Sequence, residues 1–473
     1  MKIKTGAVLF YLMFLLTPLS LCAQVIASGG RHSMNICADS TVRSWGYNGF
    51  GQLGNGNLTE QHTSVLVINL SGIKQVAGGL FHSLFVKSDG TVWSSGRNAN
   101  GPLGDGTSID KNVTVQVKGL TQINQAAGGG EHSLFLRNDG TVWVCGLNSS
   151  GQLGDGTNIS KNAPVMINGL TEIIQVAAGA EFSLFLKRNG TVWACGHNGY
   201  GQFGNGTTIS KNIPVQVAGL TDIVQLSAGE WHAVFVKNDG TVFTTGRNNY
   251  GQLGDGSTLN KSTPTQVVGL SGIIQSDAGG IHTVFVKSDG TVWSCGLNSG
   301  GNNDGQLGDG TNVDKLIPVQ VISSWGTSKI IYADACREHS LYLEDNGTIW
   351  GSGRNNYGQL GYGSFTTANF FTPVKSVVKC AVLPVSNSNI KSKYDKFYFY
   401  PNPTDSETTL MSDINLKGAT LIFYNCYGQQ VHLIKNSIGH GFTINKGELR
   451  KGIFFVKLLQ NNLVISNSKL IIM

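Results

Sequence analysis

The sequence lacks the patterns that mark most enzymes and metal-binding proteins. Its eight cysteines show no metal-type spacing such as C-x-x-C, no G-K-[ST] follows its glycine-rich turns, and no D-x-D-x-D run supplies calcium ligands. The 3.6-residue apolar period of an amphipathic helix is absent as well. We therefore expect no metal, no cofactor and no phosphate-binding loop, in a fold without helices.

Basic charge is missing where a nucleic-acid-binding surface would need it. The formal net charge is +6, but the positive excess lies in residues 1–23 and beyond residue 382. Residues 24–382 are therefore close to neutral and lack the basic footprint that phosphate contacts require. We expect no nucleic-acid partner.

Long apolar runs are absent beyond the N-terminus. Residues 1–23 carry Lys2 and Lys4 ahead of an apolar core at 7–16, and they end in a Leu-Cys-Ala cleavage sequence. This is the pattern of a secretory signal peptide. The apolar run is too short for a membrane-spanning helix, and no other stretch reaches the necessary length. We expect an exported chain with no transmembrane segment.

One phrase is present in seven copies. Its marker, GQLG or a close variant, begins at positions 51, 101, 151, 201, 251, 305 and 358. Each copy reads as four short strands. An Asp-Gly or Asn-Gly pair, which favours a type I′ turn, separates the second strand from the third in every copy but the first. Four-stranded units at this period predict an all-β fold: a seven-bladed β-propeller over residues 24–380.

The full phrase, A-G-x-x-H-S-L followed by G-x-V and G-x-N-x-x-G-Q-L-G, resembles the regulator of chromosome condensation repeat. The resemblance covers about residues 24–380 and implies a seven-bladed propeller. The chromatin binding and nucleotide exchange of the eukaryotic namesake are not carried over, because one fold hosts many functions and this propeller is near-neutral and exported. Secreted bacterial relatives include a proteinaceous β-lactamase inhibitor, so the resemblance also implies enzyme inhibition as one function.

The repeat stops at a linker, residues 381–396. In residues 397–473, alternating apolar positions and Gly/Asn turns predict a small β-sandwich. Four landmarks resemble the C-terminal sorting domain of the bacterial type IX secretion system: YPNP (400–403), YG (427–428), GIFFVK (452–457) and KLII (469–472). The resemblance implies the type IX machinery as a partner, a secreted or outer-surface location, and removal of the domain. Release or attachment to surface glycolipid would follow. An unrelated adhesive β-domain is the alternative.

Three residue types recur at fixed strand positions, which favours structural roles. The histidines are interpreted as buried rings bonded to neighbouring backbone, too far apart around a propeller to share a metal. The tryptophans are interpreted as core residues and three cysteines as small buried residues. The recurring residues are His32, His82, His132, His232, His282, His339 (with Phe182 in the fourth copy), Trp93, Trp143, Trp193, Trp293, Trp350, Cys145, Cys195 and Cys295.

Other positions vary freely between copies on the face that the 1–2 and 3–4 loops share. Mixed aromatic, Arg and Glu side chains on a rigid ring predict a binding surface for an extracellular protein or glycan, with drift at exposed loop tips as the alternative. Before the histidine slot lie Arg31, Phe81, Glu131, Glu181, Trp231, Ile281 and Glu338. After the third strand lie Tyr47, Arg97, Leu147, His197, Arg247, Leu297 and Arg354. The 3–4 loops add Phe50, Tyr200, Tyr250 and Tyr357.

Insertions cluster in the last two copies. They are residues 301–304, a longer crossover at 322–329 and extra residues at 364–371. Such loops on a rigid scaffold often carry function. Four aromatic residues there have no repeat counterpart: Trp325, Phe365, Phe370 and Phe371.

One enzymatic alternative remains. Asp277 and Asp334 replace a small residue at the same first-strand position of adjacent blades. Paired carboxylates near a central channel are compatible with a carbohydrate-active enzyme, but a structural role in hydrogen bonds is the favoured interpretation, because buried carboxylates usually have partners. Because no serine–histidine–acid spacing or cofactor loop accompanies them, we expect a protein that is not an enzyme and has no catalytic residues.

Overall fold

The computed structural model describes residues 25–299, 305–322, 325–363 and 369–378, and five strand segments between 397 and 472. The predicted signal peptide and linker lie outside the described residues. The chain divides into two compact units, Met1–Val385 and Ser386–Met473. No described helix is long and apolar enough to cross a membrane.

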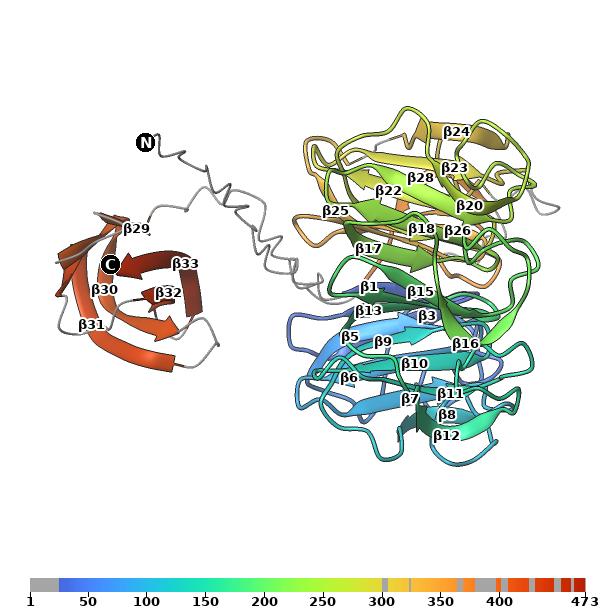
Figure 1. The fold of residues 1–473 in the computed structure, drawn as a ribbon, viewed down its shortest axis with the longest axis horizontal. Helices are drawn as coiled ribbons and strands as arrows, with labels where there is room; N and C mark the ends of the chain where they lie inside the picture. The colour runs from blue at the N-terminus through green and yellow to red at the C-terminus, as the bar shows by residue number, and fades with distance from the viewer. Residues whose placement is uncertain are drawn as a thin grey trace, which may run out of the picture. The chain divides into compact units, whose positions relative to one another are not determined.

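The first unit contains seven four-stranded antiparallel sheets arranged as the blades of a propeller, which confirms the predicted fold (Figure 1). Blades 1 to 4 are formed by β1 (Ile26–Ser28), β2 (His32–Ile36), β3 (Val42–Gly46), β4 (Gln61–Leu66); β5 (Ile73–Gly78), β6 (His82–Lys87), β7 (Val92–Gly96), β8 (Lys111–Gln116); β9 (Ile123–Gly128), β10 (His132–Arg137), β11 (Val142–Gly146), β12 (Lys161–Met166); and β13 (Ile173–Ala178), β14 (Phe182–Lys187), β15 (Val192–Gly196), β16 (Lys211–Gln216).

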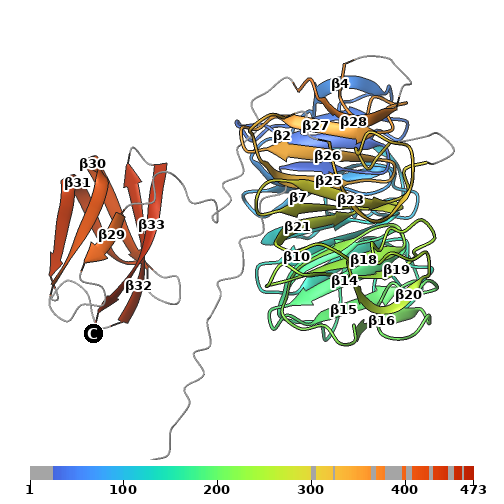
Figure 2. The ribbon, with the colours of Figure 1, turned by 90° about the horizontal axis from the view of Figure 1, so that it is seen from above.

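Blades 5 to 7 repeat the pattern, and strands of blade 7 lie beside those of blade 1 (Figure 2). They are formed by β17 (Ile223–Ala228), β18 (His232–Lys237), β19 (Val242–Gly246), β20 (Lys261–Gln266); β21 (Ile273–Ala278), β22 (His282–Lys287), β23 (Val292–Gly296), β24 (Lys315–Gln320); and β25 (Ile330–Ala335), β26 (His339–Glu344), β27 (Ile349–Gly353), β28 (Phe370–Lys375). Every described blade consists of four consecutive strands, so no described strand is exchanged between the first and last blades.

The turn between the second and third strands differs from the predicted type I′ turn. In blade 2 the amide of Gly90 donates to the carbonyl of Lys87, and only the glycine has a positive φ, 82°. A type I′ turn needs positive φ at both central residues, so this loop is the longer kind in which a left-handed glycine follows the turn. Asp89 then accepts hydrogen bonds from the amide and hydroxyl of Thr91, at 2.9 and 2.7 Å.

The hydrophobic core lies between neighbouring blades. Leu84 and Val86 of blade 2, for example, belong to one buried cluster with Phe135 and Cys145 of blade 3. The three recurring cysteines are buried and free, as predicted, and Cys336 is too; Cys37 is disulfide-bonded. The recurring tryptophans pack against these core clusters, as predicted, and stay partly exposed.

The recurring histidines link each blade to the next. Nε2 of His82 lies 2.9 Å from the hydroxyl of Ser133 in the following blade, and this hydroxyl donates to the Pro102 carbonyl at 2.8 Å. Because the serine proton is used there, the serine oxygen accepts the Nε2–H of a neutral histidine. The predicted backbone partner was therefore wrong: the partner is a side chain. The other five links join His32 to Ser83, His132 to Ser183, His232 to Thr283, His282 to Ser340 and His339 to Ser33.

At the one junction without a histidine link, between blades 4 and 5, both the histidine and the hydroxyl are replaced. Where blade 4 has Phe182 instead of histidine, blade 5 has Ala233 instead of serine or threonine, and both residues are fully buried. A lone hydroxyl or a lone imidazole in this site would leave a polar group without its partner, which costs stability. The two substitutions therefore compensate for each other.

Side-chain contacts close the ring between blades 7 and 1. Besides the link from His339, the hydroxyl of Ser33 and the indole N–H of Trp45 both donate to the carbonyl of Gln359, each at 2.8 Å. Trp45 is fully buried and occupies the strand position that holds serine, threonine or cysteine in other blades. A large side chain therefore fills the seam where no strand is shared.

The second unit is a five-stranded antiparallel sheet: β29 (Phe397–Tyr400), β30 (Glu407–Tyr424), β31 (Gln430–Asn445), β32 (Gly452–Gln460) and β33 (Leu463–Ile472). The GIFFVK landmark begins β32 and KLII ends β33, and the two strands pair with Gly452 opposite Ile472. Residues 401–403 and the YG landmark lie outside the described residues. Pairing of the described strands defines one sheet, and the predicted sandwich stays a prediction.

We predict that acid destabilises the propeller through its histidine links. Burial lowers the pKa of His82 to about 4 and that of the other five to about 3. Between about pH 6.5 and pH 3 the unfolded chain binds protons that the folded chain does not. The free energy of unfolding therefore decreases as the pH is lowered, by up to about 1.4 kcal/mol per pH unit for each histidine. Asp277, whose pKa burial raises to about 6, and Glu230, whose pKa burial also raises, act oppositely but are two groups against six. Urea unfolding from pH 7.5 to 4, followed by tryptophan fluorescence, measures this. Constant stability across the range would contradict neutral buried rings.

The compensating pair gives a second prediction. Thr283→Ala removes the acceptor of the His232 N–H and should lower the free energy of unfolding by about 1–3 kcal/mol. The double change His232→Phe with Thr283→Ala copies the natural pair in blades 4 and 5, so it should recover part of this loss and remove one histidine from the pH dependence. Ser288→Ala, in an exposed turn, is the control and should change stability by less than about 0.5 kcal/mol. A double variant less stable than Thr283→Ala alone would argue against the link.

Candidate functional site

The two variable positions of each blade lie side by side. The amide of the residue after the third strand donates to the carbonyl of the residue before the histidine slot, as from Arg247 to Trp231 at 2.9 Å. The same bond joins the corresponding residues in all seven blades. These positions and the tips of the 3–4 loops form a continuous ring on one face of the propeller, which we call the rim. Its described side chains are partly exposed, except Arg354, which is buried.

The 3–4 loops that carry the rim are held rigidly from inside. In blade 5, Asn248 is fully buried; its side-chain oxygen accepts from the amide of Leu253 at 2.9 Å, and its side-chain nitrogen donates to Asp255 at 3.0 Å. Gln252 accepts from the amide of Tyr250 at 3.0 Å and so fixes the loop tip. Equivalent bonds recur in other blades. The rim therefore presents its variable side chains on a scaffold of constant geometry.

Neighbouring blades meet at the rim in chemically matched pairs. At five of the seven junctions, the tip of the 3–4 loop contacts the residue before the histidine slot of the following blade, 31 positions further along the chain or across the seam. Aromatic residues face aromatic residues, hydrogen-bond donors face carboxylates, and a tyrosine faces an arginine. The pairs are Phe50 with Phe81 (5.1 Å between ring centroids), Tyr200 with Trp231 (5.7 Å), Asn100 with Glu131, Ser150 with Glu181 (2.7 Å) and Tyr357 with Arg31 (3.2 Å).

Two parts of the rim are aromatic. The seam sector consists of Tyr47, Phe50, Phe81 and Tyr357 in blades 7, 1 and 2, with ring centroids 5.0 to 6.2 Å apart. The blade 4–5 sector consists of His197, Tyr200, Trp231, Tyr250 and Arg247. In the latter, the imidazole of His197 lies 5.1 Å from the indole of Trp231, between ring centroids. Glu131 and Glu181 lie between the two sectors along the chain, and Ile281 follows the second.

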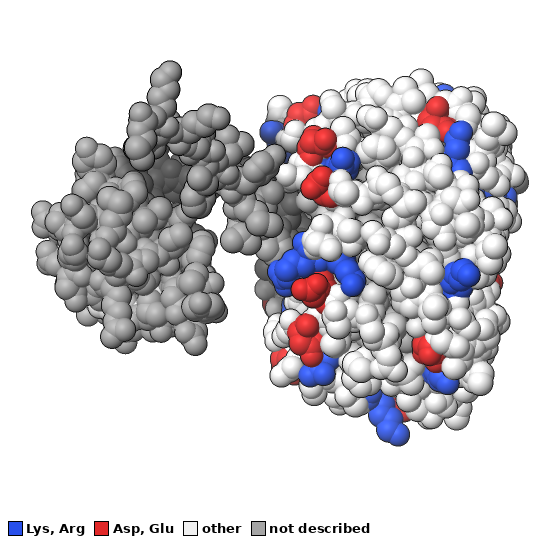
Figure 3. Space-filling view, viewed as in Figure 1, with Lys and Arg blue, Asp and Glu red and all other residues white. Residues whose placement is uncertain are grey.

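Arginines join the aromatic rings to the acidic residues. Arg97 lies 5.3 Å from the ring centroid of Phe50 and forms an ion pair with Glu131 at 2.9 Å. Arg354 lies near Tyr357 and pairs with Glu338. Figure 3 shows that charged side chains gather along the two edges of the propeller, while the wall between them is almost uncharged. Charge is thus concentrated near the loop ends of the blades.

Asp277 and Asp334 lie in the first strands, beside the central channel, and both are hydrogen-bonded to neighbouring blades. Asp277 accepts from the hydroxyl of Ser227 in blade 5 and from the amide of Ala335 in blade 7, at 2.5 and 2.8 Å. Asp334 accepts from the amide of Ser28 in blade 1 at 2.7 Å and from the hydroxyl of the same serine. Each carboxylate thus bridges blades around the channel.

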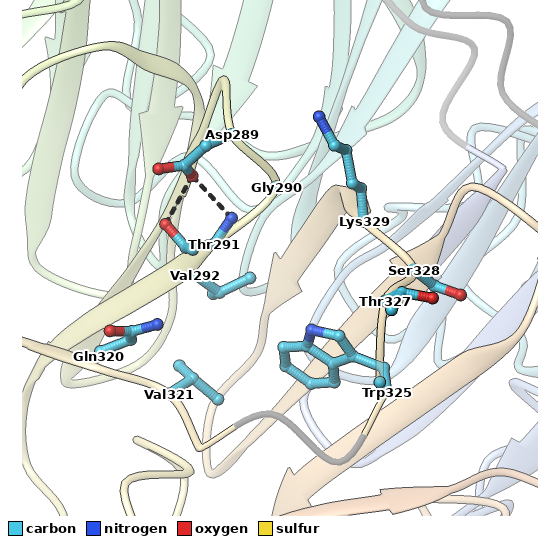
Figure 4. A pocket seen from close by; sticks show the side chains of 11 residues that line it. Asp289, Gly290, Thr291, Val292, Gln320, Val321, Trp325, Thr327, Ser328 and Lys329 are labelled. Atoms are coloured by element: carbon cyan, nitrogen blue, oxygen red, sulfur yellow. Dashed lines mark hydrogen bonds between the residues drawn. The ribbon is translucent and has the colours of Figure 1, made fainter.

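The longer crossover between blades 6 and 7 forms a cavity of about 220 Å3 around Trp325 (Figure 4). Trp325 is mostly buried, with its ring 5.8 Å from that of Tyr342. It belongs to the same kind of core cluster as Leu270 in the preceding crossover, so it has a repeat counterpart, contrary to prediction. The carboxylate of Asp289 accepts hydrogen bonds from the amide and the hydroxyl of Thr291, as the dashed lines show (Figure 4). The cavity therefore has a structural origin.

Of the other residues predicted in the insertions, Phe370 and Phe371 begin β28 and are partly exposed. The ring of Phe370 packs against Tyr362, 5.1 Å between centroids. Residues 301–304 and Phe365 lie outside the described residues. Among the residues that the structure describes, no three His, Cys, Asp or Glu side chains are grouped to hold a metal ion.

Sequence reasoning missed the pairing between blades, although the signal was present. Reading the repeats at a spacing of 31 would have matched four loop tips with their partners, and reading them at 51 would have matched four of the six histidines with their hydroxyls. Both spacings cross from one copy to the next. A comparison of equivalent positions alone does not reveal them.

Comparisons with known proteins match both the propeller repeats and the C-terminal unit. The RCC1-like domain model matches residues 111–392, and regulator of chromosome condensation (RCC1) repeat models match residues 39–86 and 73–101. A secretion system C-terminal sorting domain model matches residues 398–473.

Curated relatives match only in part. The chain is 41% identical to Protein RCC2 homolog of Danio rerio over 69 residues (15% of this chain, 14% of the relative). It is 34% identical to Secretion-regulating guanine nucleotide exchange factor of Bos taurus over 87 residues (18% and 19%). The chain thus spans less than a fifth of the length of these relatives.

Solved structures share the fold. Human WBSCR16 has a TM-score of 0.60 and 24% identity, over 67% of this chain and 86% of that one. Prp20p of Saccharomyces cerevisiae has a TM-score of 0.60 and 23% identity, over 67% and 81%. At these identities the likeness concerns the fold alone.

The contacts of Asp277 lead to a prediction that separates structural from catalytic roles. Asp277→Ala removes the acceptor of two hydrogen bonds between blades and should lower the free energy of unfolding by about 1–3 kcal/mol. Asp277→Asn keeps one acceptor oxygen and should lose less. Both are measured by urea unfolding. Hydrolysis of a glycan panel by the natural chain, abolished in a folded Asp277→Asn variant, would instead favour the enzyme.

Proposed function

Because this chain belongs to the RCC1-like domain family and ends in a sorting domain that directs it out of the cell, we propose that it is an extracellular binding module that recognises a protein through its rim. The observation that carries the proposal is the pairing of rim residues between blades. Aromatic, acidic and tyrosine–arginine pairs lie along one face and remain partly exposed.

Matched pairs argue against drift at loop tips. If these positions varied without constraint, each partner would change independently of the residue that it contacts. Instead, Phe50 faces Phe81, and Ser150 faces Glu181 as a hydrogen-bond donor. Tryptophan, tyrosine and arginine are also the residues that most often dominate binding energy in protein interfaces. The composition and order of the rim therefore support recognition of a protein surface.

The C-terminal unit supports an extracellular location for this function. Its sorting domain implies an interaction with the type IX secretion machinery and a secreted or cell-surface location. We further propose that its strands form the predicted sandwich, and that the domain is removed on export before release or glycolipid attachment.

Inhibition of an extracellular enzyme is the concrete form of this function that the family resemblance suggests. A rigid ring of half-buried side chains suits it, because binding orders few flexible groups. A carbohydrate-active enzyme that uses Asp277 and Asp334 is the other candidate. Their hydrogen bonds between blades make it the weaker proposal.

We predict that the rim determines partner capture. The full secreted chain, immobilised, is exposed to culture supernatant and cell envelope beside a variant with Trp231→Ala, Arg247→Ala and Tyr250→Ala. The variant should capture at least tenfold less partner than the natural chain, because each change removes a candidate interface anchor. Quantitative mass spectrometry of the captured proteins measures the loss.

The matched control carries Asn138→Ala, Arg188→Ala and Asn238→Ala, three exposed residues in the turns of the opposite face. It should capture as much partner as the natural chain. Equal capture by the rim variant, or equal loss in both variants, would refute recognition through the rim.

A further inference from the structure

Three arginines occupy the same slot after the third strand, but only two are paired with an acid. Arg97 pairs with Glu131 and Arg354 with Glu338. Arg247, in blade 5, forms no ion pair with any described residue. The three arginines occupy equivalent positions on the same repeated backbone. The lack of an ion pair at Arg247 is therefore particular to the blade 4–5 sector.

The guanidinium of Arg247 is held between aromatic rings. Its central carbon lies 5.6 Å from the ring centroid of Tyr200 and 5.9 Å from that of Tyr250. Its Nε is buried and has no hydrogen-bond partner among the described residues. The nearby acid, Glu230, is bonded to Arg337 at 3.0 Å. Burial raises the pKa of Glu230, and Arg247 acts on it as a nearby charge that lowers the pKa, without an ion pair or hydrogen bond between the described side chains. Arg247 is therefore a positioned cation whose donors are not used by a neighbouring carboxylate.

We propose that the blade 4–5 sector binds a carboxylate of a polypeptide partner, with Arg247 as the pairing residue and Trp231 as the adjoining apolar contact. A guanidinium presents parallel donors that match a carboxylate, and stacked rings limit the freedom that it loses on binding. The carboxylate belongs either to an Asp or Glu side chain or to a chain terminus. This inference rests on the proposed function and adds the chemistry of the partner.

Exposed aliphatic side chains beside the rim favour a polypeptide over a glycan. At one 3–4 loop position, blades 2 to 6 each carry an aliphatic residue that is 56% to 69% exposed: Ile109, Ile159, Ile209, Leu259 and Val313. The residue that follows this position bonds the amide next to the variable slot, as Asn260 does for Asn248 at 2.8 Å. The aliphatic residues thus form an arc around the blade 4–5 sector. Aliphatic contacts complement apolar side chains, which a glycan does not offer.

The test uses a phage library of random peptides, some ending in a free C-terminus, selected on the full secreted chain. Peptides that also bind the triple rim variant are removed. The remaining peptides should carry Asp, Glu or a terminal carboxylate beside an apolar residue. Replacing that group by its amide should weaken binding at least tenfold, and Arg247→Gln should do the same. The two changes together should cost no more than either alone, which marks a direct pair.

Arg188→Gln, at an exposed arginine in a turn of the opposite face, is the control and should change binding less than twofold. Ile209→Ser with Leu259→Ser should weaken binding at least threefold. Rim-dependent peptides without a carboxylate, or a loss below twofold in Arg247→Gln, overturn this inference and leave the proposed function standing. A library without any rim-dependent peptide overturns it too, and the capture experiment then decides the proposed function separately. Binding to an acidic-glycan array that requires Arg247 but not the aliphatic pair would reassign the ligand class.

Discussion

A neutral, buried histidine that donates to a hydroxyl of the next blade is the contact on which the ring depends. Six of the seven blade junctions have it, including the seam between blades 7 and 1, where no described strand is exchanged. The hydroxyl donates a hydrogen bond to a carbonyl of the preceding blade, so each link engages three groups that would otherwise be buried without partners. The junction without histidine also lacks the hydroxyl, which shows that the two residues operate as a unit.

The rim is rigid because these links hold the blades that carry it in place. Blade position is fixed by buried contacts, and loop shape is fixed by a buried asparagine and glutamine. Side chains at the tips are then free to differ without loss of the fold. This separation of scaffold from surface explains why the same repeat can form an aromatic pair between blades 4 and 5 and a serine–glutamate pair between blades 3 and 4. It is also the arrangement that a binding protein needs, because a rigid surface loses little entropy on association.

Several residues that resembled functional candidates have structural roles in the fold. Trp325 fills the core at a crossover, and Asp277 connects three blades through its two oxygens. Arg247 differs from them because its donors are held in place but not used by a neighbouring acid. A binding residue on a rigid scaffold is best recognised by such an unused, positioned group.

The sequence by itself determined the seven blades, their strands and the rim positions, because a 50-residue period and alternating apolar residues can be read along the chain. The sorting domain followed from the resemblance of its landmarks to a known family. The tertiary structure decided which residues touch across blades: the hydroxyl partners of the histidines, the compensation of Phe182 by Ala233, and the unpaired state of Arg247. It also corrected the hairpin turns, whose type depends on the φ of both central residues. These features involve residues in different copies, and their pairing follows from ring closure, which no single repeat encodes.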